Sequence, residues 1–87
     1  MPYVVYILQA DDGTFYTGET KDLARRLKQH QAGRVQSTKS RTGWHIVHTE
    51  EFPTHLEAVK REREIKRRKS RKYIEKLIET SPSQSEP

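Results

Sequence analysis

The 87-residue chain is 31% hydrophobic, contains no cysteine and carries a formal net charge of +5. A chain of this length predicts one domain with a small core, and the lack of cysteine excludes disulfides, thiolate metal sites and a cysteine nucleophile. A basic domain of this size favours a polyanionic partner, with nucleic acid first among the candidates.

The N-terminus lacks a basic leader, and its apolar run is too short for a signal peptide or a membrane span. Together with the absence of cysteine, this favours a cytoplasmic protein that makes no contact with a membrane.

The first predicted element is a strand over residues 3–9. Its two faces are both largely apolar, one formed by Tyr3, Val5 and Ile7 and the other by Val4, Tyr6 and Leu8. A strand that is apolar on both faces is typical of a central position covered on both sides.

A tight-turn signal, Asp11-Asp12-Gly13, predicts a hairpin whose second strand covers residues 14–19. Tyr6 and Tyr16 then lie close together on neighbouring strands, so two phenols can point at one spot. Such pairs are also common structural filler. We expect Gly18 to bend the strand or to let the backbone approach a ligand.

A helix capped by Thr20 or Asp22 is predicted to run to about Ala32, where Gly33 stops it. Leu23, Leu27 and His30 share one helical face. At 100° per residue, Arg26 lies about 60° from Leu23, whereas Arg25 lies about 160° away on the outer face. We therefore expect Arg26 to point along the sheet and Arg25 to meet solvent or phosphate. A surface role for Arg26 and a helix-end role for His30 are the alternatives.

Residues 34–43 are predicted to form a loop and residues 44–52 a third strand that ends at Pro53. The loop offers donors for a phosphate backbone, among them Lys39 and Arg41, although an ordinary polar loop has the same composition. His45 and His48 are interpreted as strand-surface residues and His55 as an early helix residue, because their spacing does not fit a zinc site.

Thr54-x-x-Glu57 has the form of a capping box and predicts a helix over residues 55–69. Glu62 falls within the apolar side of this helix, whereas Glu64 lies about 160° away and should face water. A carboxylate in an apolar stripe is costly unless it is paired or bound to a cation. A metal ion, Arg26 or Lys66 would each satisfy Glu62.

Ser70 is predicted to cap a last short helix, and the chain divides into a domain over residues 1–79 and a disordered tail over residues 80–87. Nine lysines or arginines and two glutamates occupy residues 60–72. This segment predicts a nucleic-acid-binding face, with a solvated helix surface as the alternative. The candidate binding residues are Arg25, Lys39, Arg41, Lys66, Arg67, Arg68 and Lys69.

The order and spacing of several short motifs over residues 3–78 resemble the GIY-YIG nuclease superfamily, in its small single-domain bacterial branch. Val4-Val5-Tyr6 stands for the first family tripeptide, and Tyr16-Thr17-Gly18 is close to the second. The further similar motifs are Asp12-Gly13, Arg25-Arg26-Leu27 with His30, Ser37-Thr38-Lys39 and Glu62-x-x-Ile65-Lys66. Glu62 stands one residue nearer the helix lysine than the family carboxylate usually does.

The resemblance implies an α+β fold, a three-stranded antiparallel sheet flanked by helices. It also implies an active site formed by Tyr6, Tyr16, Arg26, His30 and Glu62. In such a site Glu62 holds one Mg²⁺ or Mn²⁺ ion, a tyrosine takes a proton from the attacking water, and Arg26 neutralises the transition state. His30 orients the site or shuttles a proton.

The expected function is therefore a metal-dependent DNA endonuclease that acts as a monomer in DNA processing or repair. Branched, nicked or single-stranded DNA is the expected substrate, because no second specificity domain is seen, and RNA is possible. The competing classes are a non-catalytic nucleic-acid-binding module with a degenerate nuclease fold and a small protein-interaction domain.

Overall fold

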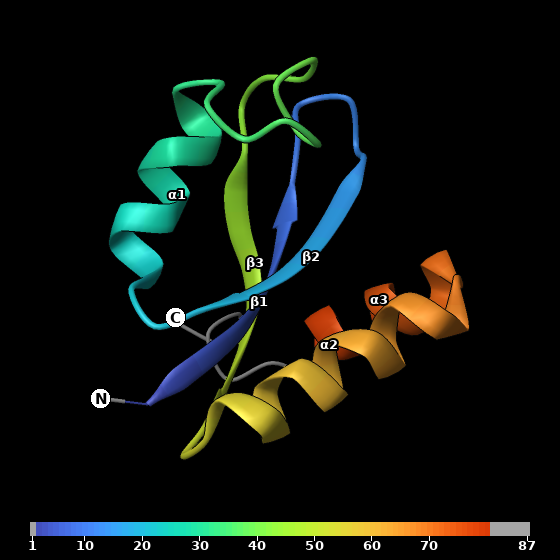
Figure 1. The fold of residues 1–87 in the computed structure, drawn as a ribbon. Coiled ribbons are helices and arrows are strands. Elements are labelled where there is room, and N and C mark those ends of the chain that lie inside the picture. The colour runs from blue at the N-terminus through green and yellow to red at the C-terminus, as the bar shows by residue number, and fades with distance from the viewer. Residues whose placement is uncertain (1, 81–87) are drawn as a thin grey trace.

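The computed structural model describes residues 2–80 and has an α+β fold, as the sequence predicted. Three antiparallel strands form one sheet in the order β2-β1-β3. Figure 1 shows α1 on one side of the sheet and α2 and α3 on the other. The elements are β1 (Tyr3–Gln9), β2 (Phe15–Thr20), α1 (Leu23–Gln31), β3 (His45–Phe52), α2 (His55–Arg68) and α3 (Arg71–Glu79).

Strand β1 is central and buried on both faces, which confirms the prediction from its two apolar faces. One core cluster contains Val4, Tyr6 and Leu8 and packs against Trp44 and the leucines of α1. The other core cluster contains Val5 and Ile7 and packs against α2 and α3. The apolar residues of α3, Tyr73, Ile74, Leu77 and Ile78, all pack on this second cluster.

The ends of the helices follow the predicted caps. Asp22, Thr54 and Ser70 are the N-caps of α1, α2 and α3, and each side chain accepts a hydrogen bond from a backbone N–H in the first turn. Helix α2 ends one residue earlier than expected, because Lys69 adopts the left-handed conformation with φ of 49°. Of the predicted tail, only Thr80, the C-cap of α3, lies within the described residues.

The prediction for His48 was wrong. Strand β3 has an irregular register against β1, with Ile46 opposite Leu8 but His48 opposite Ile7. The extra residue, Val47, lets both Val47 and His48 turn inward, since a bulge shifts the alternation of faces. His48 is therefore 5% exposed, whereas His45 is exposed as expected.

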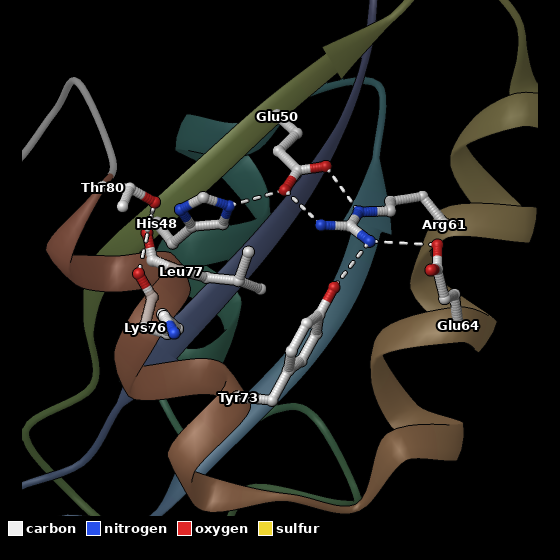
Figure 2. Close-up of polar contacts among 8 residues, drawn as sticks. All are labelled: His48, Glu50, Arg61, Glu64, Tyr73, Lys76, Leu77 and Thr80. Atoms are coloured by element: carbon white, nitrogen blue, oxygen red, sulfur yellow. Dashed lines mark hydrogen bonds and ion pairs between the residues drawn. The ribbon is translucent and has the colours of Figure 1, made fainter.

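His48 belongs to a polar network that joins β3, α2 and α3 (Figure 2). Its Nε2 donates to Glu50 at 2.7 Å, and Arg61 donates to both carboxylate oxygens of Glu50 at 2.7 and 3.0 Å. Arg61 also contacts Glu64 and the hydroxyl of Tyr73, each at 3.0 Å. The hydrogen bond from His48 and the ion pair with Arg61 lower the pKa of Glu50 to about 2. We call these residues the α2–α3 network.

None of the helices described between residues 2 and 80 is long and apolar enough to cross a membrane.

Candidate active site

Two tyrosines, a histidine and an arginine meet on the α1 face of the sheet, next to the edge strand β2. In the hairpin register Tyr6 lies opposite Gly18 and Leu8 lies opposite Tyr16, so the two tyrosines are diagonal neighbours on one face. Their ring centroids are 6.4 Å apart, and the His30 ring lies 5.8 Å from Tyr6 and 5.0 Å from Tyr16. The structure thus brings together the residues that the hairpin and the α1 periodicity indicated.

A buried chain of hydrogen bonds starts at the hydroxyl of Tyr6. Tyr6 Oη lies 2.9 Å from His30 Nε2, and His30 Nδ1 lies 2.8 Å from Thr38 Oγ1. The Thr38 hydroxyl also lies 3.5 Å from the carbonyl oxygen of Val35, so it can donate there while it accepts from His30 Nδ1–H. In that tautomer Nε2 is the bare nitrogen and accepts the hydroxyl proton of Tyr6, which leaves the lone pairs of the phenolic oxygen for other partners. In the other tautomer Nε2–H donates to the phenolic oxygen.

Thr38 is a site residue whose role the sequence did not reveal. The Ser37–Arg41 stretch suggested a phosphate-binding loop, but Thr38 is only 1% exposed and fixes the imidazole of His30. The backbone carbonyl of Thr38 also accepts the indole N–H of Trp44 at 3.1 Å. The one available signal was the resemblance of Ser37-Thr38-Lys39 to the family pattern.

Gly18 leaves room for the phenol of Tyr6. A Cβ atom at Gly18 would stand 2.5 Å from Tyr6 Oη and 2.7 Å from Tyr6 Cζ. The absence of a side chain at Gly18 therefore lets the Tyr6 ring lie against the backbone of β2. Any role of Gly18 toward a ligand is additional.

The two arginines of α1 differ as the helical phase predicts. Arg25 is exposed, whereas Arg26 is half-buried, donates to Gln29 Oε1 at 2.9 Å and acts as a hydrogen-bond partner of Tyr6. The bond with Tyr6 and the proximity of Tyr16 raise the pKa of Arg26, so its guanidinium stays charged beside both phenols.

Burial determines the protonation states of Tyr6 and His30 at neutral pH. It raises the pKa of Tyr6 to about 12, and the hydrogen bond from Arg26 offsets only part of that rise. Burial and the charge of Arg26 lower the pKa of His30 to about 4. At neutral pH Tyr6 is therefore a phenol and His30 a neutral imidazole.

Glu62 reaches this site from α2, past the edge of β2. Helix α2 runs antiparallel to β2, since His55 Nε2 lies 3.1 Å from the Glu19 carboxylate and Lys66 Nζ lies 5.7 Å from the centre of the Tyr16 ring. Glu62 pairs with Lys66 at 2.8 Å, its side chain is 18% exposed, and its charge acts on Tyr6.

Of the two side chains that the sequence allowed as partners of Glu62, Lys66 forms the ion pair. Glu64, by contrast, has a 45% exposed side chain and pairs with Arg61.

The described residues contain no group of three or more histidine, cysteine or acidic side chains that could hold a metal ion. The donor set at the site is one carboxylate, Glu62, beside two phenolic oxygens. A Mg²⁺ ion is commonly bound by one or two carboxylates together with waters and substrate phosphates, so a lone carboxylate next to a phosphate site suits a hard cation. The residues present therefore fit a magnesium-type ion that completes its shell with water and substrate.

The candidate binding residues are distributed over more than one side of the molecule. Lys66 and Lys69 line a groove beside Tyr16. Arg68 stacks over the ring of Tyr73, 4.4 Å from its centre, and Arg41 pairs with Asp12 at 3.1 Å. Arg25, Lys39 and Arg67 are exposed.

Comparison with known proteins assigns the family. Residues 2–74 match the GIY-YIG catalytic domain. A UPF0213 protein of Halobacterium salinarum is 44% identical over 63 residues, which cover 71% of this chain and 82% of that protein. A UPF0213 protein of Halalkalibacterium halodurans is 41% identical over 79 residues, covering 90% and 83%.

A solved structure has the same fold. The solution NMR structure of a UPF0213 protein from Bacillus halodurans superposes with a TM-score of 0.60 at 38% identity and covers 97% of this chain and 92% of that one. The chain therefore belongs to the GIY-YIG family, whose nuclease-type function implies a nucleic-acid substrate.

Proposed function

We propose that the protein is a metal-dependent endonuclease that hydrolyses phosphodiester bonds in DNA. One observation carries the proposal: Tyr6, Tyr16, Arg26 and His30 meet at the β2 edge, where Glu62 arrives from the opposite side of the sheet. A module that only bound nucleic acid would need the basic surface but not this convergence of phenols, guanidinium and carboxylate.

Arg26 has the position of a transition-state stabiliser. Its guanidinium lies beside the two phenols and is held by Gln29, so it is oriented before the substrate arrives. A phosphate placed against Tyr6 and Tyr16 would receive this charge as its oxygens gain negative charge. Charges arranged in advance in this way lower the barrier because they need little reorganisation.

Tyr6 is proposed as the group that accepts the proton of the attacking water. In the Nδ1–H tautomer of His30, the hydroxyl proton of Tyr6 points at Nε2 and the oxygen lone pairs are left for other partners. Proton uptake at the oxygen and proton release to His30 would then be coupled, and Thr38 would keep the imidazole in place. The neutral state of His30 at physiological pH is the state that this relay needs.

Glu62 would hold the divalent ion, Mg²⁺ or Mn²⁺, which when bound supplies a Lewis acid for a phosphate oxygen and for the leaving 3′ oxygen. Lys66 pairs with Glu62 in this structure. With Glu62 holding a cation, Lys66 would be available to contact a phosphate of the bound strand.

We further propose that the protein acts as a cytoplasmic monomer on branched, nicked or single-stranded DNA, in DNA processing or repair. The exposed cations, including Arg25, Arg67 and Lys69, support a salt-dependent contact with the phosphate backbone. Arg67→Glu with Lys69→Glu should weaken binding without unfolding the domain.

The test is incubation with a panel of branched, nicked, single-stranded and duplex DNAs in Mg²⁺ or Mn²⁺, with EDTA and the Arg26→Ala variant as controls. Cleavage of one class of DNA, lost in both controls, is the expected result. Salt-dependent binding without cleavage under every condition would instead identify a non-catalytic nucleic-acid-binding module.

A further inference from the structure

Two grooves flank the candidate active site along the edge strand β2, one at each end of the strand. We infer that they are nucleotide subsites, so that one unpaired nucleic-acid strand lies along the β2 edge with the scissile phosphate between two stacked bases. This inference rests on the proposed function for the position of the scissile phosphate, but the subsites themselves follow from the grooves.

The first groove, of about 530 Å³, lies at the C-terminal end of β2 and includes Arg26 of the active site. Its aromatic side chains are Tyr3 and His55, whose rings lie 5.1 Å apart and are tilted by 38°. Lys21 Nζ stands 5.9 Å from the centre of the Tyr3 ring, and Arg25 adds a second exposed cation. The groove also contains two carboxylates, of which Glu19 pairs with His55 and Asp22 caps α1.

The second groove, of about 350 Å³, lies at the N-terminal end of β2 and includes Tyr16 of the active site. It has the same combination of an aromatic ring and a cation. The guanidinium of Arg71 lies 4.6 Å from the centre of the Phe15 ring, and Lys66 and Lys69 line the wall formed by α2. Each groove thus shares a residue with the active site and carries its own flat ring beside positive charge.

The two grooves lie along one line because of the topology. Strand β2 is the edge of the sheet, and Figure 1 shows it passing between α1 and α2. Since α2 runs antiparallel to β2, its early residue His55 lies in the first groove and its late residues Lys66 and Lys69 lie in the second. Six residues of strand span about 20 Å, a length suited to a few nucleotides rather than to a long recognition site.

The chemistry favours a single strand over a duplex. Proteins that bind single strands combine a positive groove along the backbone with flat side chains on which bases stack, and guanidinium planes serve the same purpose. In a duplex the bases are already stacked on each other, so half-buried rings such as Tyr3 and Phe15 would have nothing to contact. Paired strands could use only the cations.

The test measures binding separately from cleavage. Wild-type protein in EDTA is titrated with a fluorescent single-stranded DNA, the matching RNA strand and a blunt duplex of equal length. A 2-aminopurine base, placed at successive positions of the DNA, reports stacking through quenching of its fluorescence. The variants are Tyr3→Leu and Phe15→Leu, which keep apolar volume but remove the flat ring, and Lys21→Gln. Phe52→Leu, a half-buried aromatic of the same core cluster, and Lys28→Gln on the outer side of α1 are the matched controls.

We expect the single strand to bind more tightly than the duplex, and each Leu variant to weaken it by about 5-fold or more, with less than 2-fold for Phe52→Leu. Each Leu variant should also relieve quenching on its own side of the strand only. Equal binding of strand and duplex, or equal losses in Phe15→Leu and Phe52→Leu at similar Tm, overturns the subsites.

Two further outcomes separate this inference from the proposed function. Stacking at both grooves without cleavage in Mg²⁺ or Mn²⁺ would uphold the subsites and reject the nuclease assignment. Tighter stacking of the RNA strand would uphold the subsites and reject DNA as the substrate.

Discussion

Each face of the sheet carries a buried histidine in a polar cluster, and the two clusters differ in how their charges are neutralised. In the α2–α3 network, Arg61 is matched by Glu50, Glu64 and Tyr73, and its charges are compensated inside the protein (Figure 2). On the α1 face, Arg26 lies beside two phenols, and among residues 2–80 the ion-pair partner of Glu62 is the exposed Lys66.

From this difference we expect the α2–α3 network to serve structure and the cluster on the α1 face to serve the proposed function. The α2–α3 network joins three elements, and because its charged groups pair with one another it leaves no charge for a ligand. A site with a cation and a carboxylate held apart around neutral groups keeps both available for a phosphate and a metal ion. The predictions below test this division, from the largest expected effect to the smallest.

The sharpest test compares the two carboxylates of α2. Glu62→Ala should lower the cleavage rate by on the order of 1,000-fold, because it removes the carboxylate proposed to hold the divalent ion. Glu64→Ala, which removes a partner of Arg61, should keep most of the activity. Rates are compared in Mg²⁺ and Mn²⁺, and calorimetric titration of Mn²⁺ gives a readout without substrate. Equal losses in both variants would remove Glu62 from its assigned role.

The arginines of α1 give the next largest effect. Arg26→Ala should reduce the single-turnover rate at saturating DNA by about 100-fold, as expected for an oriented transition-state donor. Arg25→Ala should change the Kd and lower the salt slope of binding by about one, because an exposed phosphate contact contributes mainly to affinity. The reverse ranking would show that helical phase misassigned the two residues.

Arg61 tests the opposite cluster. Arg61→Met should lower the free energy of unfolding by about 3 kcal/mol, since it leaves the Glu50 carboxylate without its bidentate partner. Urea unfolding measures this, and Arg63→Met, an exposed residue of the same helix, should change the free energy by less than about 0.5 kcal/mol. If the Arg61 variant were stable but inactive, the α2–α3 network would be functional rather than structural.

The two clusters should lose stability in different pH ranges. His30 has a lowered pKa, so its contribution to stability is complete above pH 6.5 and is lost as the pH falls to about 4. Glu50 also has a lowered pKa, so its contribution is complete above pH 4.5 and is lost as the pH falls to about 2. Each shift corresponds to about 3 kcal/mol.

The measurement is the free energy of unfolding against pH for His30→Gln and Glu50→Gln. The curve of His30→Gln should be flatter than that of the wild type only between about pH 4 and 6.5. The curve of Glu50→Gln should be flatter only between about pH 2 and 4.5. If both variants flattened the same range, the buried groups would be coupled across the sheet.

The smallest expected effect separates the two tyrosines. Tyr6→Phe should reduce the cleavage rate about tenfold more than Tyr16→Phe, and a higher pH should not restore it, because the hydroxyl proposed to relay a proton to His30 is absent. Single-turnover rates between pH 6 and 9 test this order. If both variants cleaved at the wild-type rate, neither phenol would be the base.

The sequence predicted the parts of the site that depend on local periodicity. The two faces of β1, the diagonal pair Tyr6 and Tyr16, and the half-buried position of Arg26 all follow from periods of 2 and 3.6. The caps Asp22, Thr54 and Ser70 were recognisable because short polar side chains before a helical pattern have a specific local use.

The features that the sequence did not reveal depend on contacts between distant segments. His48 is buried because β3 pairs with β1 in an irregular register, and the sequence of β3 alone does not predict that irregularity. Thr38 lies in a loop of polar residues and looks exposed in the sequence. It is buried because the loop packs against α1, where the Thr38 hydroxyl contacts His30. Arg61 finds its partners only when β3, α2 and α3 are assembled. In the sequence, the basic residues of this run therefore cannot be told apart, although they have different partners in the structure.

Gly18 has a consequence for how this site fails. The phenol of Tyr6 occupies the space where any other residue would place its first side-chain carbon. A larger residue there would separate the two strands or displace the ring from His30, while every chemical group of the site stayed in the chain. Loss of activity would then come from spacing alone, and a survey of site residues by identity would find nothing missing. Among relatives, the residue at this position is therefore as informative about a working site as the tyrosines themselves.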